Sequence, residues 1–566
     1  MSCPEVSSRF RHPPTTHQLL SSLVALSVVS LPSCGEDSAS TSWPQWGQNA
    51  QHTGSIKVTG QSPDRITATV EVDPFVAQIS GGGPLHVHYP VPLLRGEDAF
   101  LMVKTGAYTG LQTWDTQEWN WKALRWQSGE LKEKWTYRTD WKPVPSGNRL
   151  SWEPVHQAAL SGDRLYAPGF GGTVTRVDVS DGSVKARINP FGSSVDPSIF
   201  VAGPLTINAA GQVLYNAIRL DLADPWRRDV LDAWLVQVNP DDTAGTVRFA
   251  TLTPLAPAGV ALCEGEFRSD PLPWPPSVDA VPASAPCGSQ RPGINVAPAV
   301  APDGTIYTVS RAHLSARHAY LIALNPDLTP RWAASLRDRL QDGCGVRPEN
   351  GGVLPPDGAV GGCRVGSRNG VDPTINRPGG GSVLDESTSS PVVTPDGSIL
   401  YGAYTRYNYS RGHLMKFSAA GAFLTSYGYG WDLTPAIDAG TTGYSVLIKD
   451  NHYPDVGSYC SSRSICGADP GVHSITRLRS DTLSPEWSTP TPSKMEWCIN
   501  APAVDQEGKL YVHSEDGSLY VFGRDGAIVK SLFLRQPQEA AYTPLSLDSS
   551  GRIYAQNAGH FFVVGR

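Results

Sequence analysis

The chain repeats a short hairpin pattern, and the repetition narrows the folds open to it. The stretch VAPAVAPDGTIYTVS begins at Val296, and a variant, SPVVTPDGSILYGA, begins at Ser390. In both, apolar residues lead into Pro-Asp-Gly, where proline presets the first turn dihedral and glycine supplies a positive φ. The apolar and β-branched flanks favour strands. Because a lone hairpin is only marginally stable in water, the pattern predicts neighbouring hairpins.

Eight copies of the hairpin are present. The other six begin at Pro92, Pro154, Pro204, Pro435, Pro502 and Pro544. A second strand–turn–strand unit follows several of them, as in HLMKFSAAGAFLTSY from His413. Four strands, named A to D here, that repeat every roughly 40–45 residues are typical of propeller blades. The sequence predicts an all-β, eight-bladed β-propeller of four-stranded antiparallel blades, or seven blades if the weak Pro435 copy is not one.

The last copy lacks a D strand, and a strand near the N-terminus can supply it. The segment DRITATVEV alternates, which places Ile66, Ala68, Val70 and Val72 on one face, and it has no hairpin partner of its own. Joining this first strand to the last blade removes a free sheet edge. We therefore expect it to close the ring as the D strand of blade eight.

The N-terminus has the features of an export signal. Arg9 and Arg11 precede the apolar run LLSSLVALSVVSL, which is short for a membrane span but suits a signal peptide. The run ends at LPSC, which resembles the bacterial lipobox and implies lipidation of Cys34. We predict a lipoprotein signal peptide at 1–33, a lipid-anchored tether with an N-terminal motif at 34–59, and the propeller at 60–566. Ordinary cleavage near Ser33 is the alternative.

The predicted location is the bacterial cell envelope, with the lipid anchor at the outer membrane. The formal net charge is −7 and the chain has no basic block, which argues against nucleic acid as a partner. Export also permits disulfides among the seven cysteines from Cys263 to Cys498. Spacing suggests three local pairs and leaves Cys498 over: Cys263 with Cys287, Cys344 with Cys363, and Cys460 with Cys466. Zinc is the alternative, but no CxxC or HxxxH spacing is present, so no metal is predicted.

Long insertions are predicted on one face. In an antiparallel meander, the A–B and C–D turns share one face, and the B–C and D–A loops share the other. The turns of the first kind are short, whereas the insertions at 255–294 and 338–388 are D–A loops, and those at 449–473, 219–231 and 106–124 are B–C loops. Long loops on a rigid scaffold usually carry binding, so we expect a partner there, although neutral variation would produce the same pattern.

Two sets of residues on that face are candidate binding residues. Trp114, Trp119 and Trp121 fall in the predicted B–C loop TWDTQEWNWK, where exposed aromatics suit protein contact or stacking on sugars; packing beneath the loop is the alternative. Polar residues just before the A strands should line the mouth of the central channel: His88, Glu153, Asn295, Asp432, Asn500 and Tyr542. They could hold a ligand or cation, and a wet, polar mouth would explain them equally well.

The motif WPQWGQNAQHTG at 43–54 resembles the opening motif of the PQQ-like β-propeller repeat proteins. The C–D turns that end in Trp332 and Trp487 are similar to the same family. The resemblance implies an eight-bladed propeller. The family includes quinoprotein dehydrogenases and the propeller lipoprotein of the outer-membrane β-barrel assembly machinery.

The sequence resembles the enzymes of that family less well than it resembles the family's common fold. The resemblance would imply a calcium site, a catalytic Asp, a Trp stacked on the quinone and, in many members, a vicinal Cys-Cys, which this chain lacks. No GxSxG motif or phosphate loop is present either. We predict a non-catalytic, monomeric envelope scaffold without a cofactor, which binds an envelope protein or a glycan through its loops. The alternatives are a PQQ-dependent dehydrogenase with PQQ and calcium, and a polysaccharide-active enzyme.

Overall fold

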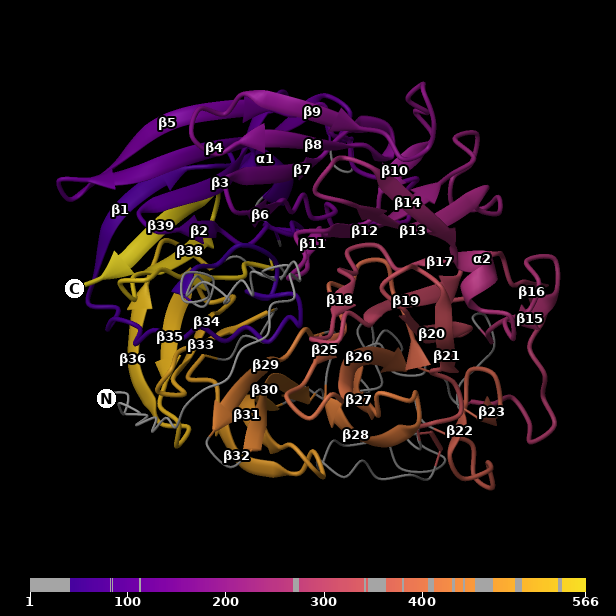
Figure 1. Ribbon diagram of the computed structural model, residues 1–566. Coiled ribbons are helices and arrows are strands. Elements are labelled where there is room, and N and C mark those ends of the chain that lie inside the picture. Colours follow the sequence, from indigo (N-terminus) through magenta and orange to yellow (C-terminus); the bar gives the residue numbers. More distant parts are fainter. Residues whose placement is uncertain are drawn as a thin grey trace, which may run out of the picture. The chain divides into compact units, whose positions relative to one another are not determined.

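The protein is an eight-bladed β-propeller, as the sequence predicts (Figure 1). The computed structural model describes residues 41–566, apart from 82, 84, 111–112, 268–273, 341–342, 345–362, 379–380, 406–411, 430–432, 441–442, 453–471, 494–500 and 538–541. Residues Ala39–Arg566 form one compact unit. All eight hairpin copies form the inner part of a blade, so the weak Pro435 copy is a blade and the seven-bladed alternative is wrong.

Blades one to four cover residues 93–335. Blade one is β2 (Leu93–Arg95), β3 (Asp98–Gly106), β4 (Gln117–Gln127) and β5 (Glu130–Arg138). Blade two is β6 (Ala159–Ser161), β7 (Arg164–Pro168), β8 (Val174–Asp178) and β9 (Val184–Ile188). Blade three is β10 (Ile199–Val201), β11 (Thr206–Ile207), β12 (Val213–Arg219), β13 (Asp232–Val238) and β14 (Ala244–Arg248). Blade four is β17 (Gln290–Pro292), β18 (Ala299–Val300), β19 (Ile306–Ala312), β20 (Ala319–Leu324) and β21 (Pro330–Ser335).

Blades five to eight complete the ring. Blade five is β24 (Gly381–Ser382), β25 (Val392–Val393), β26 (Ile399–Thr405), β27 (Gly412–Phe417) and β28 (Phe423–Tyr429). Blade six is β29 (Ala436–Gly440), β30 (Gly443–His452), β31 (Val472–Arg479) and β32 (Pro485–Pro490). Blade seven is β33 (Ala503–Val504), β34 (Leu510–His513), β35 (Ser518–Phe522) and β36 (Ile528–Phe533). Blade eight is β37 (Ser546–Leu547), β38 (Ile553–Asn557), β39 (His560–Gly565) and β1 (Arg65–Glu71).

The remaining elements are short. They are α1 (Val76–Ser80), α2 (Phe249–Leu252), the 3₁₀ turn at Phe170–Gly172, and the two-stranded sheets of β15 (Leu262–Glu264) with β16 (Ser284–Pro286) and β22 (Val371–Asp372) with β23 (Arg377–Pro378). In blades three, four and five the A strand is split, so that β10, β17 and β24 precede the inner piece. No helix within the described residues is long and apolar enough to cross a membrane.

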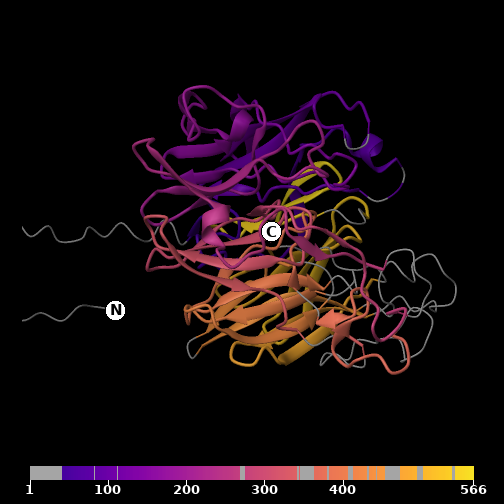
Figure 2. The same cartoon turned by 90° about the vertical axis from the view of Figure 1, so that its right-hand side faces the viewer.

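Burial within a blade follows the stacking of the blades on one another. The B and C strands of blade four, β19 and β20, are buried at every residue, because each face packs on a neighbouring blade. The outermost strands are far more exposed and alternate, as in β14. Figure 2, turned by 90°, shows the blades from the side.

Tryptophans in the D strands of blades one, four and six dock these blades onto the next blade of the ring. The indole Nε1 of Trp135 donates to the carbonyl of Val179 at 2.9 Å, and that of Trp332 donates to Ala419 at 3.0 Å. Trp487 repeats the contact with Arg524 at 3.0 Å. Each ring covers a turn glycine with positive φ, and a Cβ on that glycine would lie within 2.7 Å of the ring in all three blades. The turns that end in tryptophan thus have a structural role.

The N-terminal strand closes the ring, as the sequence predicts. β1 pairs antiparallel with β39, so indigo and yellow segments lie side by side in Figure 1. Ala68 and Val70 pack against the core. Ile66 does not share their face, because the register shifts between Ile66 and Ala68 and a bulge re-aims the preceding side chain. Ile66 is therefore exposed.

The segment before β1 forms a belt along the inner strands, which we define as residues 43–61. Backbone N–H groups of the inner strands would be buried without partners if the channel were empty. In seven blades, the N–H of the second inner-strand residue instead donates to an oxygen of the belt: Leu94, Leu160, Ile207, Val300, Val393, Ile437 and Val504. In blade eight, Gln61 N–H donates to the Gly551 carbonyl at 2.7 Å.

The side chains of the belt fill the interior of the ring. The Trp46 ring is buried against Ala297 and Ala501, which precede the inner strands of blades four and seven. His52 bonds the carbonyl of Pro391 at 2.9 Å and the hydroxyl of Thr206 at 3.2 Å, and so joins blades five and three. The motif WPQWGQNAQHTG is therefore a structural plug on the axis of the ring.

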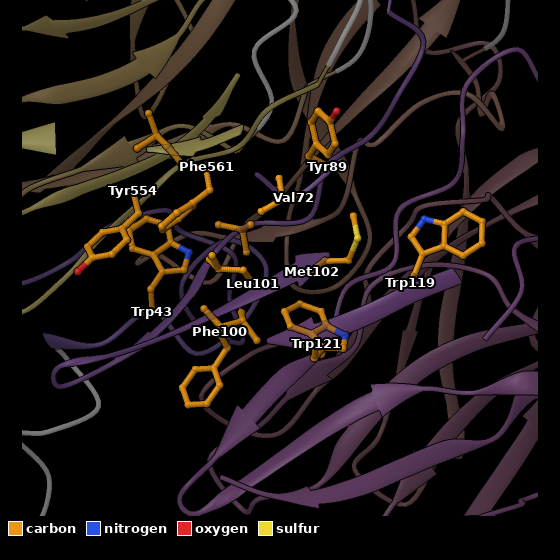
Figure 3. Packing of buried hydrophobic residues seen from close by; sticks show 14 of the residues in the cluster. Trp43, Val72, Tyr89, Phe100, Leu101, Met102, Trp119, Trp121, Tyr554 and Phe561 are labelled. Carbon is orange, nitrogen blue, oxygen red and sulfur yellow. The ribbon is translucent and has the colours of Figure 1, made fainter. Parts of the chain in front are cut away.

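The largest core cluster lies where the chain closes on itself. Figure 3 shows Trp43 of the belt among side chains of blades eight and one, including Tyr554, Phe561 and Leu101. Trp43 is fully buried in this cluster. First and last segments thus share one core, which couples the belt and β1 to the stability of the ring.

Candidate functional site

The channel mouth contains a buried ionic group. Lys104, near the end of β3, lies 3.0 Å from Asp73 Oδ2 and 2.6 Å from Glu153 Oε2. The Trp119 indole donates to Glu153 at 2.7 Å, and the Tyr89 hydroxyl donates to Asp73 at 2.9 Å. Burial raises the pKa of Glu153, and the attraction of Lys104 opposes that rise only in part. Both carboxylates are thus already held by donors of the protein.

The other described mouth residues are also buried and bonded. Asn295 Oδ1 accepts from the Val155 N–H at 3.0 Å, and the Asn295 N–H donates to the Ala202 carbonyl at 2.6 Å, which ties blades two, three and four together. The ring of Tyr542 lies 4.8 Å from that of His88 and beneath Lys449 Nζ, at 5.2 Å. Asp432 and Asn500 lie outside the described residues. A ligand-binding role for this set stays a prediction.

His86 and His88 form an HxH motif in the loop before blade one, a pattern that can bind a metal, but their rings contact different partners. His86 stacks on Trp152 at 4.3 Å between ring centroids, whereas His88 Nδ1 contacts the Glu153 carbonyl at 2.9 Å. Burial lowers the pKa of His86. Across the described part of the chain, no group of three or more His, Cys, Asp or Glu side chains could hold a metal ion.

The mouth contains a second ionic group, which the sequence analysis did not predict. Arg291 of β17 forms a bidentate pair with Asp385 at 2.6 Å for each contact, and Arg311 adds a contact at 3.1 Å. The two guanidinium groups hold the pKa of Asp385 well below its usual range, although burial opposes them. Asp385 lies between β24 and β25, the two pieces of the A strand of blade five, and Glu386 beside it accepts from the Ser151 N–H.

That last contact joins loops from distant blades across the mouth. No local motif marks these residues, because the partners are separated in sequence by 94 residues for Arg291 and Asp385 and by 235 for Ser151 and Glu386. Only the arrangement of the blades brings them together.

The predicted tryptophan patch is wrong as an exposed surface. β4 begins at Gln117, so Trp119 and Trp121 are strand residues on its inward face, and both are fully buried. The Trp121 indole donates to His156 Nε2 at 2.9 Å, and Trp114 is buried as well. The signal was the alternation of Trp119, Trp121 and Ala123 with polar residues, which is a strand period. These tryptophans belong to the core of blade one and are not free to contact a partner.

The described parts of the two large D–A insertions pack together into one structure, called here the insertion module (the described residues of 255–289 and 338–378). Phe267 N–H donates to the Thr374 carbonyl at 3.1 Å, and Arg364 N–H donates to the Trp274 carbonyl at 2.8 Å. Arg317, between β19 and β20 of blade four, donates to the Thr374 hydroxyl at 2.8 Å. β22 and β23 accordingly lie close to β15 and β16 at the right of Figure 1.

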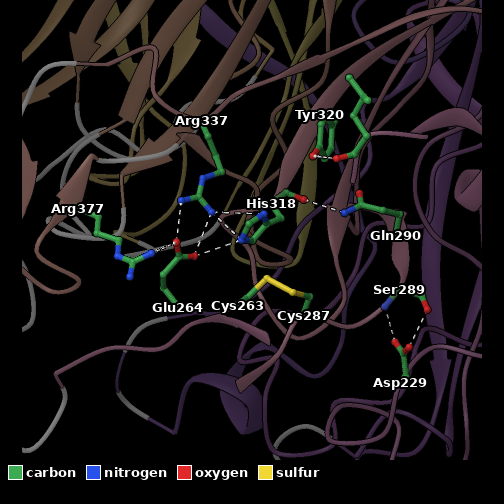
Figure 4. The surroundings of a disulfide bond; sticks show 11 residues. Asp229, Cys263, Glu264, Cys287, Ser289, Gln290, His318, Tyr320, Arg337 and Arg377 are labelled. Atoms are coloured by element: carbon green, nitrogen blue, oxygen red, sulfur yellow. Dashed lines mark hydrogen bonds and ion pairs between the residues drawn. A yellow bond between two sulfur atoms is a disulfide. The ribbon is translucent and has the colours of Figure 1, made fainter. Parts of the chain in front are cut away.

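Two disulfides brace the insertion module, as the sequence predicts. Cys263 bonds Cys287, and Cys344 bonds Cys363. The predicted Cys460–Cys466 pair and Cys498 lie outside the described residues. Figure 4 shows Glu264 beside the first disulfide, in contact with Arg337, Arg377 and His318. Burial opposes ionisation of Glu264, but the Arg337 contact outweighs it and lowers the pKa to about 2.

The outer side of the insertion module exposes large apolar side chains. Leu255, Val260 and Leu262 are 86%, 89% and 72% exposed. Val260 and Leu262 alternate with Ala261 and Cys263, which face the disulfide core. Val281 and Val365 are also exposed. A rigid, disulfide-braced segment that displays apolar residues to solvent has the character of a binding surface.

The fold places the chain among the eight-bladed propellers built like the PQQ-like repeat proteins. A europium-containing methanol dehydrogenase is similar over 91% of this chain and 89% of that chain, with a TM-score of 0.54 and 11% identity. The quinohemoprotein alcohol dehydrogenase from Comamonas testosteroni is similar over 94% and 82%, with a TM-score of 0.50 and 10% identity. At these identities the likeness shows the fold alone.

BamB from Moraxella catarrhalis also matches, over 89% of this chain and 99% of that chain. Its TM-score of 0.37 at 12% identity is too low to support a conclusion about fold or function. No sequence-family model and no curated protein sequence matches the chain. The resemblance to PQQ-like propellers is confirmed for the fold.

The described part of the mouth does not fit PQQ with calcium. A calcium ion needs six to eight oxygen ligands, and carboxylates are the main ones. Here Glu153 and Asp73 already share the buried ammonium of Lys104, and Asp385 is held by two arginines.

Proposed function

We propose that the protein is a non-catalytic scaffold that binds a macromolecular partner through the face bearing its insertions. The observation that carries the proposal is the insertion module, in which disulfides and cross-contacts hold exposed Leu255, Val260 and Leu262 on a rigid frame. Of the two partner classes expected from the sequence, a protein suits this surface better than a glycan, because its described residues are apolar and include no exposed aromatic ring.

The proposed scaffold is anchored in the cell envelope through lipidated Cys34, at the end of the export signal. A Cys34→Ala variant should then appear in the soluble fraction of the cell. Retention of the variant in the membrane fraction at the wild-type level would contradict the anchor.

Partner binding is tested by charging the insertion module. The variant Val260→Asp/Leu262→Asp should lose most cross-linking to a partner identified by mass spectrometry in the native envelope, because two buried aspartates would oppose an apolar contact. The matched control is Val184→Asp/Val529→Asp, which alters two exposed valines on the outer strands β9 and β36. Equal cross-linking in both variants would refute binding through the module.

The alternative expected from the sequence is a PQQ-dependent dehydrogenase, whose solved examples share the fold of this chain. It requires saturable PQQ binding in the presence of calcium, and dye reduction with an alcohol. Turnover in that assay would overturn the non-catalytic assignment.

A further inference from the structure

A groove of about 580 Å³ lies at the seam where blade eight meets blade one. One wall is β1, through Arg65, Ile66 and Thr67, and the other is the β4–β5 hairpin at Trp126 to Gly129. The hairpin is a C–D turn, so the groove opens on the face opposite the insertion module. It is therefore separate from the surface used by the proposed function.

The groove is cationic. Arg65, Arg552 and Arg566 line it together with a single acidic residue, Glu97. The guanidinium group of Arg552 is already paired with two carboxylates, with Glu97 at 2.9 Å and with Asp548 at 2.5 Å. Arg65 and Arg566 are exposed. Arg65 Nη2 donates to the main-chain oxygen of Arg566 at 3.4 Å, and within the described residues neither guanidinium group forms an ion pair with an Asp or Glu side chain. Two guanidinium groups are thus available to an anionic ligand.

The floor of the groove is preorganised. Arg552 lies over the Trp126 ring at 4.6 Å, and the Trp126 indole donates to the Tyr554 hydroxyl at 2.7 Å. Tyr554 in turn donates to Asp548 at 2.9 Å. These contacts fix the aromatic ring and leave Arg65 and Arg566 at the rim of the groove.

The β1 wall has an unused strand edge. β1 is the outermost strand of blade eight and pairs only with β39, and within the described residues its other edge has no backbone partner. The bulge beside Thr67 turns Ile66 outward, where its side chain lines the groove. An extended peptide can satisfy the backbone groups of such an edge, whereas a glycan cannot continue a sheet.

We propose that this groove binds an extended, acidic peptide segment, which adds a strand beside β1 and places carboxylates on Arg65 and Arg566. The strand edge and the cations act on different parts of the same ligand, since one bonds its backbone and the other its side chains. This recognition is independent of the insertion module.

The test measures fluorescence anisotropy of a labelled octapeptide that alternates valine and glutamate, with the full-length protein. Binding should weaken roughly tenfold or more in Arg65→Gln/Arg566→Gln, because charge-assisted contacts are lost. It should also weaken as ionic strength rises. Arg535→Gln, at another exposed arginine, is the matched control and should bind as wild type does.

Two further peptides distinguish the contribution of the carboxylates from that of the backbone hydrogen bonds. A peptide with glutamine in place of glutamate should bind weakly, and a glutamate peptide with alternate N-methylated amides should lose the strand contact. Unchanged binding in the double variant, insensitivity to N-methylation, stronger binding of oligogalacturonate than of the peptide, or no binding at all would each overturn the proposal. Val260→Asp/Leu262→Asp should leave this affinity unchanged, so failure here and failure of the scaffold function are distinguishable.

Discussion

The buried ammonium group of Lys104 neutralises the carboxylates of Asp73 and Glu153 at the channel mouth, so the stability of the mouth depends on it. Replacing it with methionine would leave Asp73 and Glu153 buried without a cation. Loss of one partner from a buried ion group costs roughly 3 to 5 kcal/mol of unfolding free energy. We expect Lys104→Met to show that loss in denaturant unfolding.

Lys122→Met is the matched control on the next strand. Lys122 pairs with Glu133 at 2.9 Å, but the two side chains are 25% and 51% exposed. An exposed pair contributes about 0–1 kcal/mol. If the two variants lost the same stability, the buried group would not have the importance assigned to it.

His52 makes the stability of the ring depend on pH. Burial lowers its pKa to about 4, with the Pro391 carbonyl opposing the shift, whereas an unfolded histidine titrates near about 6.5. Between these values the unfolded chain binds the proton and the folded chain does not, so stability falls as pH drops from 6.5 towards 4. His52→Gln should reduce this slope by up to about 1.4 kcal/mol per pH unit, as measured by denaturant unfolding at several pH values. An unchanged slope would show that His52 takes up a proton in the folded state.

Single residues show where sequence reasoning stops. The repeat located Glu153 just before an inner strand, but its partner Lys104 lies on another blade and no spacing rule connects them. Arg291 and Asp385 are a similar case. Trp119 and Trp121 differ, because their period-two pattern was readable and a strand assignment would have placed them in the core.

At the scale of elements, the hairpin repeat predicts well because each blade is built locally. Proline, glycine and the apolar flanks specify the A–B turn within about 15 residues. The same local logic identified β1 as the missing strand of blade eight, since it alternates and has no hairpin partner. The split inner strands of blades three to five and the bulge in β1 were not predicted. The additional pieces pair with the B strands of their own blades, and the bulge lies in the pairing of β1 with β39, and no local residue pattern marks either feature.

The insertions are elements of another kind. Their ends and two of their disulfides follow from the broken repeat and the cysteine spacing. Their mutual packing does not, since it depends on backbone contacts such as Phe267 with Thr374, far apart in sequence. That packing turns two Pro- and Gly-rich loops into one rigid surface.

At the scale of the whole molecule, the belt and β1 close the ring in two different ways. β1 completes one blade, whereas the belt supplies hydrogen-bond acceptors to the inner strands of seven blades and a donor to the eighth. A net contribution of about 1 kcal/mol for each such bond makes the belt a large share of a typical folding free energy.

A protein that begins at residue 62 should therefore keep β1 but lose stability, with Tm lower by roughly 10 °C or more. A synthetic peptide of residues 41–61, added in trans, should restore Tm in a saturable manner, because binding to the folded state stabilises it by mass action. The same peptide with Trp43→Ala and Trp46→Ala should restore little, since both rings are buried in the native ring. Differential scanning calorimetry at increasing peptide concentration measures all three. A shortened chain that melts as the full chain does would mean that the inner strands satisfy their backbone groups without the belt.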